Sequence, residues 1–448
     1  MIIEFRVQNH RSFRGEQTLS LAASNYDKTL PENLITPALP GLPDLRLIKA
    51  AALYGPNAGG KTNVLKALQF LQWLVLESAT GQKPEAKLPV EPFRLDHESE
   101  GKPTVLELTF IAENVRYELA VAVTRERVVQ ERLVAYPSGR AQVWYDRVWN
   151  DDAKQYDWSP EKPTEFERDA GIVEKTRENA LFLSTVAQWN NGQVTPVYAW
   201  FSKKLKFLNN LGEDADTISN AFTAQLFNRS SEIRKIVTGI LRSADFGLAG
   251  IDVKEKSMDT LTGQMFGALV SMKRQLGHPT DFSPESLWQV SFQHEGEMGN
   301  SFGMDWQDES AGTRRFFSVL GPWLALIEQG QILCIDEIET SLHPILVEEL
   351  LRLLFKTNAQ VRPQLLFTTH NPLLLDMTLL RRDQVWFADK NREGESFLYP
   401  LTDYKPRADE SLVRGYLSGR YGAVPFIPHG LVGEPAGEAG PAEVKRAG

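Results

Sequence analysis

Cysteine is almost absent from this chain, because Cys334 is the only one in 448 residues. A single thiol excludes an internal disulfide, and such scarcity is typical of proteins from reducing compartments. Cys334 lies within an apolar run, residues 332–335. We therefore expect a buried structural thiol and not a nucleophile.

Long apolar runs are missing as well. No stretch approaches the ~20 apolar residues that a membrane-spanning helix needs. Residues 1–6 alternate like a strand and lack the charged start and apolar centre of a signal peptide. We expect a cytoplasmic protein with no membrane partner.

The chain has fewer basic residues than acidic ones, 49 against 58. The formal net charge is −9, so the molecule as a whole repels nucleic acid. Any contact with DNA or RNA has to come from a local basic patch, although such clusters usually form a solvated helix face. The candidate clusters are Lys203, Lys204 and Lys206, and Lys273 with Arg274.

The chain does have a phosphate-binding loop. Residues 55–62 read Gly-Pro-Asn-Ala-Gly-Gly-Lys-Thr and match G-x-x-x-x-G-K-[ST], between a strand-like run and an apolar helix-like run. At average composition, chance produces this pattern in roughly 1% of chains of this length. We therefore interpret it as a Walker A motif that binds a nucleoside triphosphate.

Each part of this loop has a chemical reason. Its glycines permit backbone conformations closed to other residues, so that N–H groups can turn inward around an anion. Lys61 adds a mobile charge for the β- and γ-phosphates, and Thr62 offers a hydroxyl to Mg²⁺. The expected nucleotide-binding residues are Gly55, Asn57, Gly59, Gly60, Lys61 and Thr62.

A second apolar run ends in two carboxylates, Asp336 and Glu337. This is typical of a parallel strand buried on both faces, whose carboxyl end lies at the ligand-binding edge of the sheet. Asp336 is placed to hold the Mg²⁺ shell, and Glu337 to accept the proton of an attacking water. We interpret the pair as Walker B.

Another apolar run, residues 364–369, ends at His370. A lone histidine at a strand end is more often a surface or capping residue. Beside the two Walker motifs, however, His370 falls where a γ-phosphate sensor is expected, able to donate a hydrogen bond or to orient water.

A further segment, residues 308–315, precedes Walker B and contains Ser310 and Gly312. By itself it predicts a capped helix, since Ser310 can cap the first turn. Gly312 would let that turn approach an anion closely. Its position before Walker B makes it a candidate signature motif.

The order of elements predicts an α/β fold. Strands are expected at 2–8, 18–22, 47–54, 104–111, 115–123, 127–136 and 141–149, the last four as an antiparallel meander. Residues from about 160 to 245 look helical, followed by strand-like runs at 265–272 and 287–293. The last third alternates, with helices at 310–328 (interrupted at Gly321-Pro322), 344–356 and 372–380, and strands at 331–335, 364–369 and 384–388.

Taken together, these motifs resemble the ABC-type ATPase head of RecF-like and chromosome-maintenance ATPases. The chain is still more similar to the bacterial AAA-type, ABC-like ATPases of abortive-infection and phage-defence operons. The segments that carry this resemblance lie at 9–13, 22–24, 55–58, 309–313, 336–344 and 415–426.

The resemblance implies a P-loop NTPase head with an antiparallel β subdomain and an inserted helical subdomain. Its expected parts are an N-terminal lobe (1–150), a mostly helical insertion (151–285), a C-terminal lobe (286–430) and a disordered tail (431–448). It also implies ATP with Mg²⁺, and a homodimer or higher even oligomer.

In such a dimer, Lys61, Thr62, Asp336, Glu337 and His370 would act in cis, and Ser310 with Gly312 in trans. Residues 341–343 match the D-loop position. The chain departs from the pattern of these families at two places. The signature reads Glu-Ser-Ala-Gly-Thr, and no Q-loop glutamine stands near Pro92-Phe93-Arg94.

Three functions are compatible with these residues. The first is an ATP hydrolase whose dimer closure gates a separately encoded effector in anti-phage defence, because the segment after His370 has no Asp-x-Asp pair of a nuclease module. The second is a DNA-repair or recombination ATPase that binds DNA with ATP. The third, a scaffold that hydrolyses nothing, is disfavoured by the intact Glu337.

Overall fold

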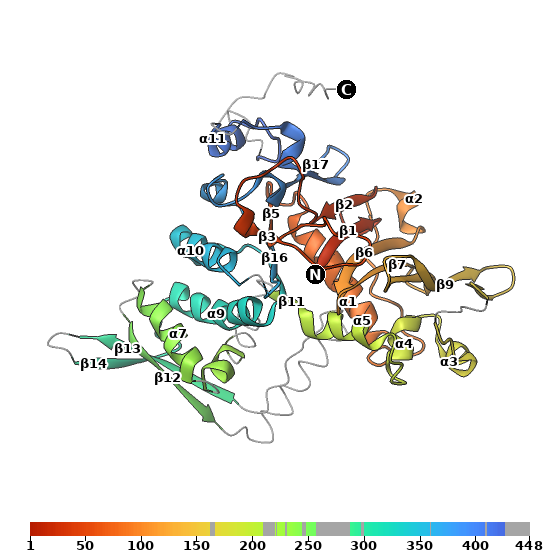
Figure 1. The fold of residues 1–448 in the computed structure, drawn as a ribbon, viewed down its shortest axis with the longest axis horizontal. Helices are drawn as coiled ribbons and strands as arrows, with labels where there is room; N and C mark the ends of the chain where they lie inside the picture. Colours follow the sequence, from red (N-terminus) through yellow and green to blue (C-terminus); the bar gives the residue numbers. More distant parts are fainter. Residues whose placement is uncertain are drawn as a thin grey trace.

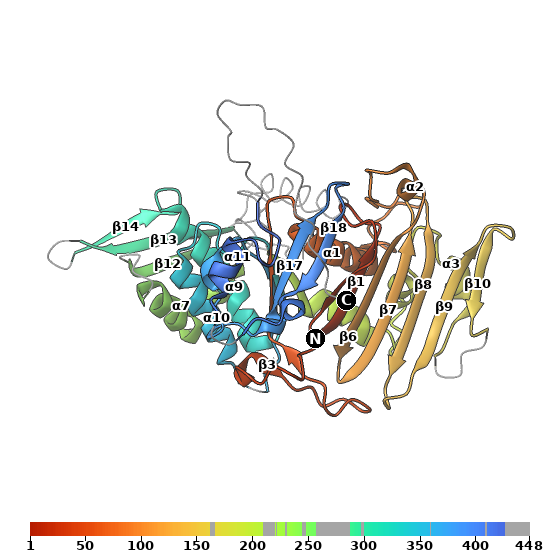
Figure 2. The same ribbon diagram turned by 90° about the horizontal axis from the view of Figure 1, so that it is seen from above.

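The computed structural model describes residues 1–161, 166–208, 220, 222–228, 231–243, 248–256, 287–296, 300–358, 360–407 and 410–425. Two large sheets pack on opposite sides of helix α1 (Lys61–Glu77), and a smaller sheet lies apart from them (Figures 1 and 2). The fold is α/β, with the phosphate loop at the start of α1.

The first large sheet is antiparallel and has the strand order β10-β9-β8-β7-β6-β1-β2. Its strands are β1 (Ile2–Gln8), β2 (Gln17–Ser20), β6 (Thr104–Ala112), β7 (Val115–Val123), β8 (Val128–Tyr136), β9 (Gln142–Asn150) and β10 (Gln155–Ser159). The predicted meander is confirmed, and β10 extends it beyond the predicted strands.

The second sheet has the order β11-β15-β16-β5-β17-β18, all parallel except β18. Its strands are β5 (Ala50–Tyr54), β11 (Leu205–Leu208), β15 (Ile332–Ile335), β16 (Gln364–Thr368), β17 (Val385–Lys390) and β18 (Ser396–Pro400). Figure 1 shows α9 (Ala311–Gln329) and α10 (Pro344–Phe355) on the side of β16 opposite α1.

This second sheet is buried on both faces, as the continuous apolar runs predict. Ala51, Leu53 and Leu366 face the α1 core, whereas Ala52, Leu333 and Phe367 face the core built by α9 and α10. Cys334 is fully buried in the first of these cores, and burial raises the pKa of its thiol. The expectation of a buried structural thiol is confirmed.

The third sheet is antiparallel, with the order β12-β13-β14. Its strands are β12 (Leu248–Lys256), β13 (Leu287–Glu295) and β14 (Ser301–Asp305), and helix α7 (Ser231–Ser243) packs against β12. In both views it lies beside α9, at the end of the molecule away from the seven-stranded sheet.

The remaining elements are short. They are β3 (Leu34–Ile35), β4 (Leu47–Ile48), α2 (His97–Glu100), α3 (Ala170–Lys175), α4 (Phe182–Ala187), α5 (Thr195–Ala199), a π-helical turn (Trp200–Lys204) and α11 (Leu412–Leu417), with short 3-10 turns between them.

Three strands, β10, β11 and β12, lie within residues 151–285, which we expected to be mostly helical, together with helices α3, α4, α5 and α7. β11 is only four residues long and gains its stability from parallel pairing with β15, which no local pattern reports. The domain boundaries themselves stay predictions. The run at 265–272 and the tail at 431–448 lie outside the described residues.

Two helix predictions also need correction. Helix α9 continues through Gly321 and Pro322 without a break, because Thr223 packs against this point and its Oγ1 accepts the Gly321 N–H at 3.1 Å. At 372–380 only the 3-10 turn Pro372–Leu374 forms. Downstream of it the Asp376 side chain accepts the Thr378 N–H at 2.7 Å, a local bond that competes with helix.

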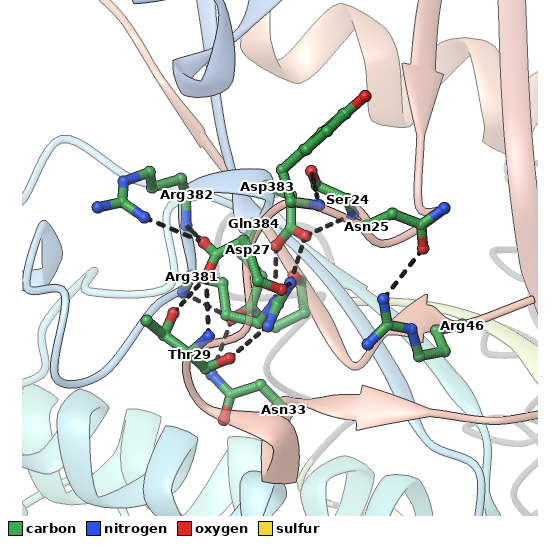
Figure 3. A network of polar contacts seen from close by, with 12 residues as sticks. Ser24, Asn25, Asp27, Thr29, Asn33, Arg46, Arg381, Arg382, Asp383 and Gln384 are labelled. Atoms are coloured by element: carbon green, nitrogen blue, oxygen red, sulfur yellow. Dashed lines mark hydrogen bonds and ion pairs between the residues drawn. The ribbon is translucent and has the colours of Figure 1, made fainter. Parts of the chain in front are cut away.

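The loop at residues 22–33 is tied to the second sheet by a buried polar network (Figure 3). Arg381 donates to both oxygens of Asp383, at 2.9 and 2.7 Å, and also to the main-chain oxygens of Asp27 and Thr29. Asp383 in turn accepts the Ser24 N–H at 2.7 Å. Ser24 of the Ala-Ala-Ser segment is therefore bonded to the turn that precedes β17.

Candidate nucleotide and magnesium site

The phosphate loop follows β5 at the carboxyl edge of the parallel sheet. Gly55 has a φ of 151° and Gly60 a φ of 111°, both strained for any residue with a Cβ. Space excludes a side chain as well, since a Cβ on Gly55 would lie 2.1 Å from the carbonyl oxygen of Ala388. A Cβ on Gly60 would lie 2.6 Å from Oγ of Ser396.

Lys61 is 5% exposed and its ammonium group is held by the loop. Nζ donates to the carbonyl oxygens of Gly55 at 2.8 Å and of Pro56 at 3.0 Å. Burial lowers the pKa of Lys61 to about 8, against the opposing charges of Asp336, Glu337 and Glu339. The loop thus keeps a poorly solvated cation where phosphate would bind.

The predicted magnesium ligands meet across the sheet. Thr62 Oγ1 lies 2.9 Å from Oδ1 and 3.1 Å from Oδ2 of Asp336. Thr368, at the end of β16 between β5 and β15, donates to Asp336 Oδ1 at 2.7 Å and fixes the carboxylate. A hydroxyl and a carboxylate side by side form the hard-oxygen donor set that suits Mg²⁺.

Glu337 follows at the end of the same strand with a φ of 49°, a conformation unusual for a residue with a side chain. Its N–H donates to Thr368 Oγ1 at 2.7 Å, which stabilises this bend. Thr340 Oγ1 donates to Glu337 Oε2 at 3.2 Å. The side chain is half-buried next to Asp336, where a general base would stand.

His370 joins this group from the end of β16. Burial lowers its pKa, and the nearby Lys61 charge adds to the effect, whereas Glu339, Glu337 and Asp336 oppose it. A neutral imidazole at physiological pH keeps one donor and one acceptor nitrogen. The structure therefore brings Lys61, Thr62, Asp336, Glu337 and His370 together.

Sequence reasoning missed Glu339, which lies at the centre of this cluster. Its Oε1 accepts the His370 N–H at 2.5 Å. Its Oε2 and the hydroxyl of Tyr54 are both buried without a partner among the described residues. The Glu339 charge and burial raise the pKa of Tyr54 well above its usual value, with burial the larger cause. A third carboxylate, two residues after the Asp336-Glu337 pair, was the available signal.

The N-terminal motif at 9–13 also reaches the loop. Ser12 Oγ accepts from Asn63 Nδ2 and from Ser396 Oγ, both at 2.8 Å, directly beside Gly60. His10 is 2% exposed and stacks on Phe70 of α1, and burial lowers its pKa to about 3. The motif thus positions the loop and the first turns of α1.

The C-terminal motif supports the loop from its other side. The ring of Tyr416 in α11 meets that of Tyr54 edge-on, with centroids 5.8 Å apart. Burial raises the pKa of Tyr416, and a hydrogen bond with the Gly55 backbone opposes this shift. This contact places Tyr416 of the C-terminal motif next to the phosphate loop.

The signature residues are not part of this cluster. Ser310 is exposed at the N-cap of α9, where its Oγ accepts the Thr313 N–H at 3.1 Å. Among the described contacts, none links Ser310 or Gly312 to the Walker residues. Residues 341–343 follow Walker B and lead into α10, with Ser341 at a φ of 58° and His343 capping the helix.

The lysines considered for nucleic acid are largely used within the fold. Lys204 Nζ donates to the Gln329 carbonyl oxygen at 2.7 Å, and Lys206 Nζ to that of Ser202 at 2.6 Å. Lys273 and Arg274 lie outside the described residues. These contacts give no support to a basic patch at 203–206.

One family model matches residues 50–376, from the start of β5 to beyond His370. Its description is "AAA domain, putative AbiEii toxin, Type IV TA system". The chain belongs to this AAA family. The match spans both Walker motifs and the candidate signature, so this AAA protein has a P-loop NTPase fold.

Solved structures similar to this AAA protein include the SMC head domain from Thermotoga maritima, with 12% identity and a TM-score of 0.37, covering 89% of this chain and 98% of that one. A second similar structure is an Smc head bound to the C-winged helix domain of ScpA, with 11% identity and a TM-score of 0.43. The match covers 89% of this chain and 97% of the Smc head chain.

No curated protein matches the AAA chain. Within the part of the chain that the structure describes, no helix is long and apolar enough to cross a membrane.

Proposed function

We propose that this AAA protein hydrolyses ATP with Mg²⁺, and that hydrolysis requires two chains closed head to tail. One observation carries the proposal: Thr62 and Asp336 share a hydrogen bond at the mouth of the phosphate loop, with Lys61 and Glu337 beside them. Residues far apart in sequence thus converge on one place that suits a metal-bound triphosphate.

The roles follow from geometry. Lys61 exchanges its carbonyl partners for the β- and γ-phosphate oxygens, because a phosphate is a stronger acceptor for an ammonium group. Thr62 and Asp336 would hold Mg²⁺, which neutralises phosphate charge when bound. Glu337 accepts the proton of the attacking water, and His370 contacts the γ-phosphate from the neighbouring strand end.

The second chain is needed because the signature is absent from the cis cluster. Ser310 is exposed, and its hydroxyl caps α9 at a helix N-terminus, where anions are stabilised. A second chain turned head to tail would bring Ser310 and Gly312 to the γ-phosphate held by the first. The composite site is therefore complete only in the dimer.

The dimer is proposed to gate a separately encoded effector in anti-phage defence. Support comes from the family description, which names a putative toxin and a type IV toxin–antitoxin system. The test is co-purification of a protein encoded beside this chain with the Glu337→Gln variant in Mg²⁺-ATP. Retention with ATP but not ADP supports gating, whereas no nucleotide-dependent retention contradicts it.

The enzymatic part has its own test. Purified protein should release phosphate from ATP in the presence of Mg²⁺, and Glu337→Gln should lower turnover at least ~100-fold, as loss of a general base predicts. The same variant should accumulate as a dimer with ATP by light scattering. Hydrolysis that is absent, or unaffected by Glu337→Gln, would refute the proposal.

A further inference from the structure

The signature segment is directly continuous with the small third sheet. Strand β14 ends at Asp305, and α9 begins at Ala311, only a short connection later. Within it the Asp308 N–H donates to the Asp305 carbonyl oxygen at 3.0 Å. Any shift of this sheet relative to α9 must therefore pass through the residues just before Ser310.

An apolar contact holds the sheet on the helix. Phe292 of β13 is fully buried, and its ring centroid lies 5.8 Å from those of Trp306 and Phe317. Trp306 lies in the connection and Phe317 on α9, so Phe292 touches both sides of the signature segment. This contact anchors the sheet but does not orient the backbone of Ser310.

A polar contact does reach that backbone. His294 follows Phe292 by two residues and so lies on the same face of β13. Its Nε2 is hydrogen-bonded to Oε1 of Glu309, a side chain only 4% exposed. The other oxygen of Glu309, Oε2, accepts the Ser310 N–H at 3.3 Å. One carboxylate therefore spans the distance from the sheet to the signature serine.

The pairing also has an electrostatic role. Glu309 is buried beside the helix end that would meet the partner's γ-phosphate, where an unpaired carboxylate would repel the anion. The hydrogen bond from His294 stabilises the buried carboxylate at this position and orients it. Without it, an oxygen of a buried carboxylate would lose its partner, which is unfavourable because a buried charged group depends on its hydrogen bonds.

We propose that His294 and Glu309 are positioning residues for the signature, through which the β12–β14 sheet controls how Ser310 engages the nucleotide of the partner chain. The inference rests on the head-to-tail dimer proposed above. It predicts a defect in the trans half of the composite site and none in the cis half. Anything that displaces the third sheet would then weaken dimer closure without touching the Walker residues.

The variant His294→Ala tests this in the full-length chain. ATP affinity of the monomer should stay within about two-fold, while the dimer dissociation constant in the Glu337→Gln background rises about ten-fold, as loss of one charge-assisted hydrogen bond predicts. Turnover in the Glu337 form should fall by a similar factor. His294→Gln, which keeps an N–H donor, should recover part of the loss.

Two further variants keep the test decisive. Gln293→Ala is the matched control, since Gln293 is the neighbour on the opposite face of β13 and bonds to Asp252 and Ser301, not to the signature. It should leave dimerisation unchanged. His294→Ala combined with Glu309→Gln removes the unpaired charge and should dimerise better than His294→Ala alone. A lower melting temperature of His294→Ala with unchanged dimer closure would contradict the inference.

A mixing experiment isolates the trans effect. Lys61→Ala lacks a working cis site but keeps its signature, whereas His294→Ala keeps its cis site. A mixed dimer therefore retains one intact composite site. Random mixing should give about a quarter of wild-type turnover, because half of the dimers are mixed and each has one of two sites.

The outcomes separate the two proposals. If wild-type protein dimerises and hydrolyses ATP but His294→Ala matches it, the positioning role is wrong and the ATPase proposal stands. If the mixture is no more active than its components, or if His294→Ala loses monomer ATP binding, the role is again wrong. If the wild-type chain itself neither dimerises nor hydrolyses, the proposed function fails first.

Discussion

Thr62 Oγ1 lies 2.9 Å from Asp336 Oδ1, although 274 residues separate the two in sequence. The contact joins the first turn of α1 to the residue that follows β15. In the sheet, β16 lies between β15 and β5, the strand that leads into the phosphate loop. Thr368 at the end of β16 bonds to the same carboxylate oxygen at 2.7 Å. Three elements thus fix two oxygens where a hard cation would bind.

The magnesium prediction concerns these two oxygens. Asp336→Asn should abolish the Mg²⁺-dependent part of ATP affinity, because an amide oxygen carries no charge for the cation. Binding of ATP in the presence of EDTA should change little, and Thr62→Ser, which retains a hydroxyl, should behave as wild type. Titration with Mg²⁺ at a fixed ATP concentration measures the Mg²⁺ dependence of ATP binding in both variants. An unchanged Mg²⁺ dependence in Asp336→Asn would rule out this site.

Glu339 should be needed for turnover more than for binding. Its Oε1 holds the His370 backbone, so Glu339→Ala should lower kcat about ten-fold, the cost of one hydrogen bond to a charged group. Glu339→Gln, which keeps an acceptor oxygen, should lose less. Steady-state kinetics separate kcat from KM.

The comparison variant is Tyr54→Phe, which removes a buried hydroxyl that has no hydrogen-bond partner in the described part of the chain. It should leave turnover unchanged and keep or slightly raise the melting temperature. Equal turnover in wild type, Glu339→Ala and Glu339→Gln would show that the His370 backbone needs no such support.

ATP binding should depend on pH through Lys61. Burial lowers its pKa to about 8 in the nucleotide-free chain, so the ammonium form dominates below pH 8 and is lost above it. Phosphate favours the charged form, so binding above pH 8 requires proton uptake. The dissociation constant should then rise by up to about ten-fold per pH unit.

Calorimetry in two buffers of different ionisation enthalpy measures this uptake directly. The number of protons taken up on ATP binding should be near zero at pH 6.5 and approach one per site at pH 9. In Lys61→Arg the guanidinium stays charged throughout, so any remaining binding should show no uptake. Proton release at pH 9 in the wild-type chain would contradict the assignment.

The buried pair Arg381 and Asp383 should be important for stability. Their side chains are 0% and 6% exposed, and Asp383→Ala would leave the guanidinium buried without its carboxylate. We expect a loss of about 3–5 kcal/mol in the free energy of unfolding. Thermal or urea unfolding measures it.

The surface pair Arg352 and Glu348, 37% and 39% exposed, provides the control. Glu348→Gln should change stability by less than about 1 kcal/mol, because solvent screens an exposed ion pair. Similar losses from the two substitutions would mean that the buried network in Figure 3 stabilises the fold no more than an exposed ion pair does.

Much of the fold was readable because local pattern and burial agree in it. The meander of β6 to β9 alternates strictly enough to be predicted, and the apolar runs of β5, β15 and β16 match strands buried on both faces. The predictions that failed concern segments whose structure depends on residues far away in the sequence. β11 is held by β15, and the Gly321–Pro322 segment stays helical through Thr223, so long-range contacts decided both.

The sequence by itself determined which residues form the proposed cis site, because the phosphate loop, Walker B and His370 each stand at the end of a recognisable strand. It could not show Glu339 beneath His370, Tyr416 behind the loop, or His294 bonded to Glu309. The two residues of each contact are separated in the chain, and their side chains meet only because the fold brings the elements that carry them together. Only the tertiary structure decides them, since side-chain hydrogen bonds require distances that no local pattern encodes.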